Sequence, residues 1–321
     1  MKKRARYTIQ PLMAFLFIIL CQPLAMAQTE TEQDNEGTLR VQHFDARTLS
    51  LGEATLADVF GNTTIGINPA LSGLLNNGRE LHLNSYHNWD TNLVQHDVTL
   101  PSLILNKHHF TARAGLTNSG YEEINYLGSA QLPEPDVEQY HADLAYAYAF
   151  SNVFSMGVLQ SVSYTFNDED DFVTYFADIG LVYAPAENLS YGLAVRGIGR
   201  DSHYTINTAG ETILYHQRMG QILDLGSTFR FSQNKRTFLT MSLGNEKRFG
   251  EDGIWYKGGI ELIPIPAISI RGGALFHVGQ DEFIPRLGIG LDAGYFILDY
   301  MAAPKNIRGE NYHQLGLTFQ F

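Results

Sequence analysis

The chain alternates between apolar and polar residues in short segments from residue 79 to its carboxy-terminus, and turn residues separate these segments. The clearest segment places Tyr140, Leu144 and Phe150 on one side and His141 and Asp143 on the other. Successive side chains of a β-strand point to opposite faces, so each segment predicts a strand with one apolar and one polar face. We count about fourteen such segments, which together predict an all-β domain.

The last segment carries this pattern to the final residue, with Leu315, Leu317, Phe319 and Phe321 on its apolar face. Chain ends usually fray, so a strong strand at the terminus must be paired on both edges or covered. A closed barrel in a membrane meets this need, and an ordinary strand of a soluble sandwich is the alternative. The apolar ending at Leu317, Phe319 and Phe321 resembles the β-signal of bacterial outer-membrane proteins, which implies the barrel-assembly machinery as a partner.

The connections between the segments favour the membrane barrel, because short and long connections alternate along the chain. The short turns are residues 151–152, 185–188, 232–235, 264–267 and 293–294. The longer polar connections are residues 117–138, 167–171, 200–213, 245–253, 277–284 and 302–311. Aromatic residues also gather near strand ends, as in the interfacial girdles of such barrels. We therefore predict a closed antiparallel transmembrane β-barrel of about fourteen strands.

The amino-terminus has the layout of a secretory signal peptide. A basic start with Lys2, Lys3 and Arg4 precedes an apolar run over residues 12–20, and Ala25-Met26-Ala27 is a small-residue cleavage site. The apolar run is too short to cross a bilayer as a helix, so an amino-terminal anchor is the weaker alternative. We predict export through a cleaved signal peptide and location in the outer membrane of a Gram-negative-type bacterium.

Composition adds two constraints. Cleavage would remove the single cysteine, Cys21, so the mature chain would hold no disulfide and no cysteine metal site. Cleavage would also remove four of the 22 basic residues and none of the 34 acidic ones, giving a net charge of about −16. Such a charge argues against nucleic acid as a partner. The predicted layout is a signal peptide at 1–27, a flexible leader at 28–37, a compact segment at 38–78 and the barrel at 79–321.

The inward face of the predicted barrel carries ionisable groups of both signs. They are Arg113, His141, Asp143, Asp178, Arg196, Asp224, Arg230, Lys257, Glu261, Arg271, Arg286, Asp292 and Asp299. Glycines share this face at 157, 180, 192, 226, 244, 259, 273, 288 and 316, and they would let a plug or a ligand approach the wall closely. One interpretation is a lumen filled by ion pairs and a plug, and the other is a polar conduction path. Mixed charge without a ring of one sign favours the first.

Little in the sequence points to catalysis or to a bound ion. Histidines occur at 82, 87, 96, 108 and 109, but no nucleophile, base and orienting group stand at a recognisable spacing. The acidic run Asp168-Glu169-Asp170-Asp171 offers oxygen ligands for calcium, yet it lacks the ligand spacing of a calcium loop and fits a solvated outer loop better. We predict a protein that is not an enzyme and that uses no cofactor and no metal.

Residues 46–74 carry a pattern that resembles a known family. Ala46-Arg47 precedes Gly52, a run of small residues contains Ala57-Asp58, and Asn68-Pro69-Ala70 follows, where Asn68 can cap a short helix opened by Pro69. This pattern, with the signal peptide and the strands, resembles the amino-terminal signature of the FadL-type outer-membrane superfamily. The resemblance implies that residues 38–78 fold into the lumen as a hatch, with Asn68, Pro69 and Ala70 as the hatch motif.

The superfamily includes transporters of long-chain fatty acids and hydrocarbons and the PorV/PorQ proteins of type IX secretion. The short polar loops of this chain resemble the PorV/PorQ branch more closely. The main functional prediction is therefore a non-enzymatic barrel that serves type IX-like protein secretion or surface attachment, with secretion proteins as partners. The alternative is an outer-membrane channel for hydrophobic small molecules such as long-chain fatty acids. A soluble secreted β-protein or an outer-membrane enzyme is the third hypothesis. Membrane lipid is an expected partner of the first two.

Overall fold

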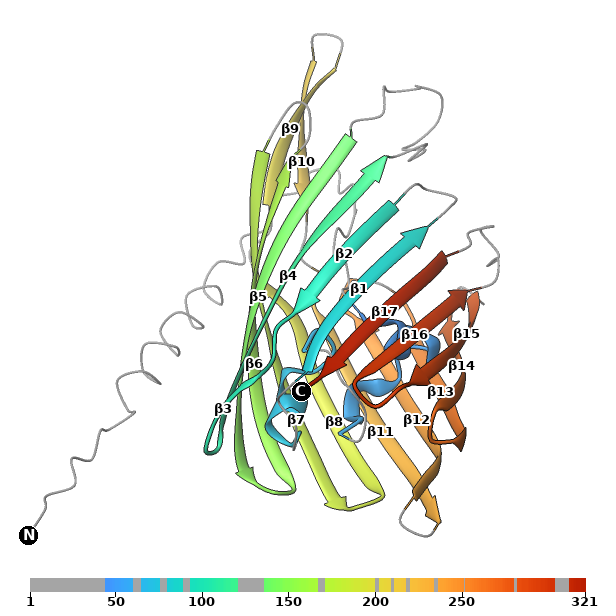
Figure 1. The fold of residues 1–321 in the computed structure, drawn as a ribbon. Helices are drawn as coiled ribbons and strands as arrows, with labels where there is room; N and C mark the ends of the chain where they lie inside the picture. The colour runs from blue at the N-terminus through green and yellow to red at the C-terminus, as the bar shows by residue number, and fades with distance from the viewer. Residues whose placement is uncertain are drawn as a thin grey trace, which may run out of the picture.

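A computed structural model shows that the chain forms a closed antiparallel β-barrel (Figure 1). The structure describes residues 44–59, 65–75, 80–88, 93–120, 136–166, 171–199, 202–208, 211–217, 220–233, 236–250, 252–279, 282–303 and 312–321. The barrel strands are β1 (Glu80–Asn88), β2 (Leu93–Thr99), β4 (His108–Gly120), β5 (Asp136–Ser151), β6 (Phe154–Phe166), β7 (Asp171–Ala186), β8 (Leu189–Gly199), β11 (Ile222–Gln233), β12 (Arg236–Arg248), β13 (Ile254–Ile265), β14 (Ile268–Val278), β15 (Glu282–Asp292), β16 (Phe296–Ala303) and β17 (Tyr312–Gln320).

These fourteen strands correspond one by one to the predicted segments, so the predicted fold class is confirmed. The ring closes where the terminal strand β17 pairs with β1, from Glu80 opposite Gln320 to Asn88 opposite Tyr312. It continues through β2, which pairs with both β1 and β4. The terminal strand is thus paired on both edges, because β16 pairs with its other side. This pairing explains why a regular strand can run almost to the last residue.

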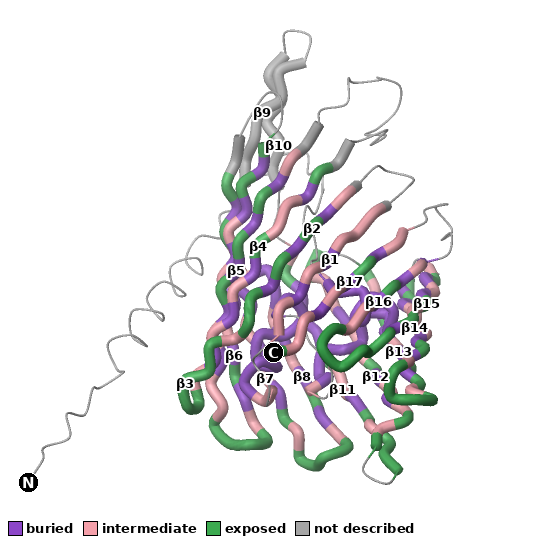
Figure 2. Tube along the Cα trace, in the orientation of Figure 1, coloured by how far each residue is buried: buried purple, intermediate pink, exposed green. Residues whose placement is uncertain are grey.

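The outer surface of the barrel is a belt of large apolar side chains. Buried and exposed residues alternate along the strands, as the alternating colours in Figure 2 show. Leu144, Tyr175 and Leu287 are among the exposed residues, at 55%, 63% and 60% exposure. On β17, Gln314, Gly316 and Thr318 are buried, whereas the predicted β-signal residues Leu317, Phe319 and Phe321 lie on the outer side. An exposed belt of this kind is typical of a barrel whose outside contacts lipid.

The connections sort to the two ends of the barrel (Figure 1). We call the end with the tight turns near 151–153, 187–188 and 293–295 the short-turn end, and the opposite end the loop end. Several predicted loops are shorter than expected because the strands continue beyond the predicted boundaries, for example β4 to Gly120 and β12 to Arg248.

Three further strands lie outside the fourteen. The predicted loop 200–213 overlaps a two-stranded hairpin of β9 (Ser202–Thr208) and β10 (Glu211–Gln217). The third is β3 (Leu103–Leu105), which pairs with β4 at the short-turn end. The alternation of apolar and polar residues predicts neither the β9–β10 hairpin nor β3.

Residues 44–59 and 65–75 lie inside the barrel, toward its short-turn end, and we call them the inner segment (Figure 1). They form helix α2 (Ala46–Ser50) and the 3-10 helices η2 (Thr55–Ala57) and η3 (Pro69–Gly73). The prediction of a short helix capped by Asn68 is confirmed, since its side chain accepts a hydrogen bond from the Ala70 backbone N–H. Within the described residues, no helix is long and apolar enough to cross a bilayer.

Candidate functional site

The inner segment packs against the wall at inward-facing glycines. A Cβ atom added at any of seven of them would collide with the inner segment or press tightly on it, and these are Gly157, Gly180, Gly192, Gly226, Gly259, Gly273 and Gly288. At Gly157 the added atom would lie 2.5 Å from the Ala70 backbone nitrogen, and at Gly192 it would lie 2.5 Å from the Leu56 carbonyl oxygen. Only glycine lets the two backbones approach so closely.

The glycine contacts are confined to one side of the barrel. The seven glycines lie on β6, β7, β8, β11, β13, β14 and β15. Gly244 meets only neighbouring wall strands, and a Cβ at Gly316 would make an ordinary 3.5 Å contact with the Ala46 Cβ. On β4, Gly115 makes room for wall side chains, Asp97 and His141, rather than for the inner segment. The closest backbone approaches of the inner segment are therefore to these strands, and the segment also packs against β4, β5, β16 and β17.

Asn68 connects two parts of the inner segment with each other and with the wall. Its side-chain nitrogen donates to the Leu56 carbonyl oxygen at 3.0 Å and to the Leu181 carbonyl oxygen of β7 at 3.2 Å. Its side-chain oxygen accepts from the Ala70 N–H at 3.0 Å. The residue is fully buried, so each of its polar atoms needs these partners. A single side chain thus ties η2, η3 and β7 together.

Buried ion pairs add to the glycine contacts. Arg47 of the inner segment lies 2.7 Å from Asp58 and 2.7 Å from Glu261 of β13. Glu53 lies 2.7 Å from Arg286 of β15. All of these side chains are largely buried, and removing one partner of a buried pair leaves an uncompensated charge. The pairs therefore fix the rotation and depth of the inner segment in the lumen.

The network continues along the wall in two directions. On one side Arg271 bridges Glu261 at 2.6 Å and Asp299 at 2.5 Å. On the other side, Arg196 and Lys257 both contact the carboxylates of Asp224 and Glu246, with distances between 2.5 and 3.1 Å. Lys257 also lies 3.9 Å from Glu53 of the inner segment. Every charged side chain of this network therefore lies within 4 Å of a charge of the opposite sign.

A separate group of charges lies on β2, β4 and β5, where the glycine contacts are absent. Arg113 pairs with Asp143 at 2.5 Å. The Nε2 atom of His141 lies 3.0 Å from Asp97, which also accepts a hydrogen bond from Gln95 at 2.6 Å. These contacts join wall strands to one another, and η3 of the inner segment packs against β4 and β5 on this side.

The structure places the predicted inward residues in three ways. Eleven are buried, and these are Arg113, His141, Asp143, Asp178, Arg196, Asp224, Lys257, Glu261, Arg271, Arg286 and Asp299. Arg230 is half-buried and lines a cavity at the short-turn end. Asp292 differs from the expectation, because it is exposed at the β15–β16 turn and accepts a hydrogen bond from the Gly294 N–H. Its position at the strand end places it beyond the enclosed lumen.

Several side chains that form these ion pairs are not predicted as inward-facing from the sequence. Asp97 and Glu246 stand at inward positions of β2 and β12, so the alternation along those strands was the signal that could have found them. Arg47, Glu53 and Asp58 lie in an irregular stretch without a period, and no local pattern marks them as wall contacts. The acidic residues 168–170, considered for calcium, lie outside the described residues. Within the described part, no cluster of three His, Cys, Asp or Glu could hold a metal ion.

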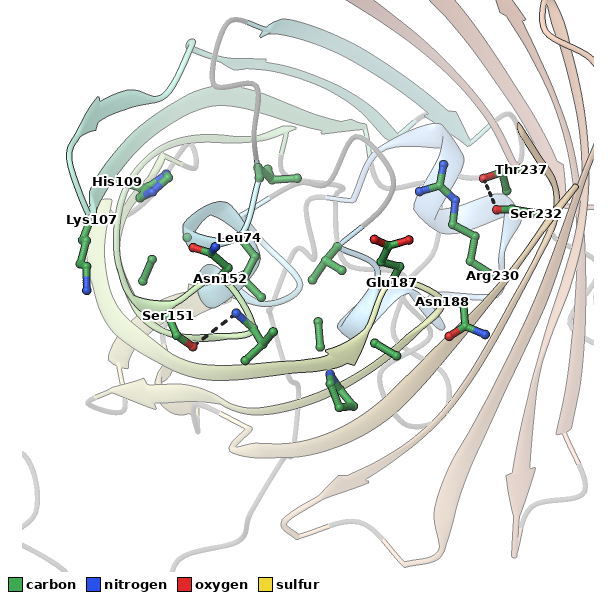
Figure 3. Close-up of a pocket in the computed structure, with 18 of the residues that line it drawn as sticks. Leu74, Lys107, His109, Ser151, Asn152, Glu187, Asn188, Arg230, Ser232 and Thr237 are labelled. Carbon is green, nitrogen blue, oxygen red and sulfur yellow. Dashed lines mark hydrogen bonds between the residues drawn. The ribbon is translucent and has the colours of Figure 1, made fainter. Parts of the chain in front are cut away.

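A cavity of about 1790 Å³ opens beneath the inner segment at the short-turn end. Figure 3 shows that residues of several turns surround it: Lys107 and His109 on one side, Ser151 and Asn152 below, and Glu187, Asn188 and Arg230 on the opposite side. Leu74, at the end of the inner segment, forms part of the lining. Apolar and polar surfaces both contribute to this cavity, which connects the inner segment with the open end of the barrel.

Beside this cavity one strand is paired along a single edge among the described residues. Strand β3 pairs with β4 along one edge, and no described strand pairs with its other edge. All three residues of β3 are exposed, and Ile104 also lines the cavity. Unpaired edges are avoided in a closed barrel wall. Ile104 therefore places the edge of β3 that has no partner among the described strands at the cavity.

Several solved structures share this architecture. The toluene transporter TbuX of Ralstonia pickettii matches with a TM-score of 0.62 and 13% identity, covering 88% of this chain and 100% of its own. The fold is that of FadL-type barrels. The monoaromatic hydrocarbon channel CymD matches with a TM-score of 0.63 and 11% identity over 90% and 99% of the two chains. A Pseudomonas aeruginosa FadL homologue matches with a TM-score of 0.61 and 11% identity over 89% and 100%.

At identities of 11 to 13% these likenesses concern the fold. No protein-family model and no curated protein matches this sequence. The predicted resemblance to FadL-type barrels agrees with the structural neighbours. The PorV/PorQ branch does not appear among the neighbours compared above.

Proposed function

We propose that this protein is an outer-membrane channel for hydrophobic small molecules, with monoaromatic hydrocarbons and long-chain fatty acids as candidate substrates. The observation that carries the proposal is the full-length match of the barrel to proteins described as a toluene transporter and a monoaromatic hydrocarbon channel. The signal-peptide pattern and the apolar outer belt support export to the outer membrane.

The occupied lumen argues against a wide aqueous pore. The inner segment acts as a hatch, held by glycine contacts on seven strands and by the ion pairs of Arg47 and Glu53. A hydrophilic solute would have to displace these buried charges, which is costly. Selective passage of hydrophobic molecules requires a route that leaves the hatch in place.

The edge of β3 offers such a route. A molecule that reaches the cavity beneath the hatch meets Ile104 and, beyond it, the exposed side chains of Leu103 and Leu105, at 57% and 53% exposure. Apolar molecules gain free energy by moving from water to such surfaces. We propose that they leave sideways at this edge and enter lipid without crossing an aqueous compartment. Transport in this scheme is downhill and needs no energy source.

The secretion or surface-attachment role expected from the PorV/PorQ resemblance has less support. Its basis was the short polar loops, and the structural neighbours are described as transporters and channels. The channel and the secretion role predict different amounts of protein on the cell surface when the gene is deleted. A strain without the gene should retain its surface-displayed proteins if the protein is a channel, and should lose them if it serves secretion.

The test of the channel is uptake across an outer membrane rich in lipopolysaccharide, which hydrocarbons cross slowly. The full chain is expressed in a host strain that lacks hydrocarbon channels, and the initial uptake of labelled toluene and of labelled arabinose is measured. We expect faster toluene uptake than in cells with the empty vector, and unchanged arabinose uptake. Equal toluene uptake in both strains would refute the proposal, and a parallel rise of arabinose uptake would indicate an aqueous pore.

A further inference from the structure

Six aromatic rings form a continuous patch on the outer face of the barrel at its short-turn end, and we call it the ring patch. The rings come from β4, β5 and β6, and they are His108, Phe110, Tyr146, Tyr148, Phe150 and Phe154. Neighbouring ring centroids lie 4.8 to 5.9 Å apart, a range in which aromatic pairs attract one another. Residues between them, such as His109 and Ala147, are buried, so the rings face outward. Leu103 and Leu105 of β3 share this face, because they pair with Phe110 and His108.

Lys107 lies at the rim of the ring patch, in the tight turn that joins β3 to β4. Leu105 pairs with His108, so the turn consists of Asn106 and Lys107 alone. Asn106 has a φ of +62°, the left-handed conformation that tight turns use. The Nζ atom of Lys107 donates to the Phe150 carbonyl oxygen at 3.2 Å, an exposed contact that places the ammonium group beside the rings. An ammonium group has three protons to donate, so further donors remain for a ligand.

The stretches of chain around Lys107 carry no acidic residue. Residues 98–118 and 144–160, which contain β3 and the ring patch, have no Asp or Glu, although the whole chain has 34. Arg113 lies in the first stretch, but it faces the lumen and pairs with Asp143. Glu187 stands across the cavity, on the side opposite Lys107 (Figure 3). The charge of Lys107 therefore favours an anionic group beside the ring patch.

The outer face becomes more apolar with distance from this rim. The cross-strand pairs, counted from the turn, are His108 with Tyr148, Phe110 with Tyr146, and Ala112 with Leu144. A cation at the rim is thus followed by rings that carry polar atoms and then by hydrocarbon side chains. Rings of this kind favour the boundary between lipid headgroups and acyl chains. A phospholipid has the same order of parts, with a phosphate, a glycerol region and acyl chains.

We propose that the ring patch and Lys107 bind one anionic phospholipid, with Lys107 and His108 on the phosphate and the rings and β3 leucines along the acyl chains. The short turns of outer-membrane barrels lie on the periplasmic side, where the leaflet consists of phospholipid. The Nδ1 atom of His108 lies 2.9 Å from the Tyr146 hydroxyl oxygen. When that hydroxyl donates to Nδ1, the neutral imidazole carries its proton on Nε2 and donates it to the phosphate. This lipid site does not depend on what the barrel transports.

The experiment counts the lipids that the folded full chain retains in native mass spectrometry. The protein in a non-ionic detergent is mixed with equal amounts of dioleoyl phosphatidylglycerol and dioleoyl phosphatidylcholine, which differ in net headgroup charge. We expect about fivefold more phosphatidylglycerol on the protein, the effect of one lysine beside an anionic headgroup. Lys107→Gln should abolish this preference. His108→Phe keeps the ring and removes a donor to the phosphate that both lipids carry, so it should lower the retention of both about threefold.

Arg236→Gln is the matched control. Arg236 is exposed at the same end of the barrel and donates to the Pro264 carbonyl oxygen at 3.3 Å, but it lies on β12, away from the ring patch. This variant should keep the full preference, and heat-modifiable gel migration checks that every variant is folded. Equal retention of the two lipids by the wild type, or a preference that survives Lys107→Gln, would overturn the site. An equal loss in Arg236→Gln would indicate unspecific attraction, and a dimer that Lys107→Gln loses would assign this face to a second copy; either result would also overturn it.

Discussion

Gly259 and Gly258 are consecutive residues of β13 that face opposite sides of the barrel wall, and they allow the packing of the inner segment to be tested directly. In Gly259→Ala the new Cβ would contact the Leu51 carbonyl oxygen and lie 2.8 Å from the Leu51 Cα. Relaxed carbon contacts are about 3.5 to 4.0 Å, so the backbones must separate by roughly 1 Å. Backbone atoms cannot rotate away, and overpacking of this kind costs about 1–3 kcal/mol.

Gly258→Ala is the matched control. The nearest atom to its new Cβ is the Leu243 Cδ2 at 3.8 Å, an ordinary contact on the outer face. Alanine there should leave the free energy of unfolding unchanged or raise it by about 0.4–1 kcal/mol, because it restricts the unfolded chain. Guanidinium unfolding in detergent micelles, followed by tryptophan fluorescence, measures both variants. Equal stabilities of the two variants would refute the close contact between β13 and the inner segment.

Three further substitutions test other parts of the structure. Glu261→Gln should lower the free energy of unfolding by about 3 kcal/mol in the same assay, because it leaves the buried Arg47 charge poorly compensated; an effect below the error of the assay would contradict a buried pair. Asn68→Ala should lower the free energy of unfolding by about 2 kcal/mol, because it removes the helix cap and the hydrogen bond to the Leu181 carbonyl oxygen. A variant as stable as the wild type would show that Asn68 does not hold the inner segment to β7. Phe321→Ala should reduce the fraction of chain that assembles into a heat-modifiable barrel, measured by gel migration, and full assembly would refute the β-signal.

The sequence predicted the barrel well because its signal is local. Alternation of apolar and polar residues over each strand is set by the geometry of the strand itself, so all fourteen strands and their outward faces could be read from residue 79 onward. The inward glycines were also visible, since a residue such as Gly180 stands in register with charged positions of the same strand. Their purpose, contact with the inner segment, followed from the resemblance rather than from the alternation.

The pairing of charges could not be predicted in the same way. Glu261 meets Arg47, which is 214 residues away, and this contact depends on barrel closure and on how the inner segment is seated. Strand β3 escaped notice because Pro101 interrupts the run that follows β2. The cavity residue His109 could be named but not placed, because its environment is made by turns from four different hairpins. The local pattern of the sequence predicts the wall strands, whereas the ion pairs and the cavity lining inside the barrel depend on its closure.

We propose that hydrophobic molecules cross this barrel while the inner segment stays in the lumen. A Cβ at Gly316 would lie 3.5 Å from the Ala46 Cβ, which suits a disulfide, so Ala46→Cys combined with Gly316→Cys would tether the inner segment to β17. The decisive measurement is toluene uptake by cells that carry this double variant in oxidised and reduced form. The account predicts equal uptake in both forms, above that of the empty vector. Uptake that falls to the vector level on oxidation would contradict it, and so would reduced cells that take up no more toluene than the vector control.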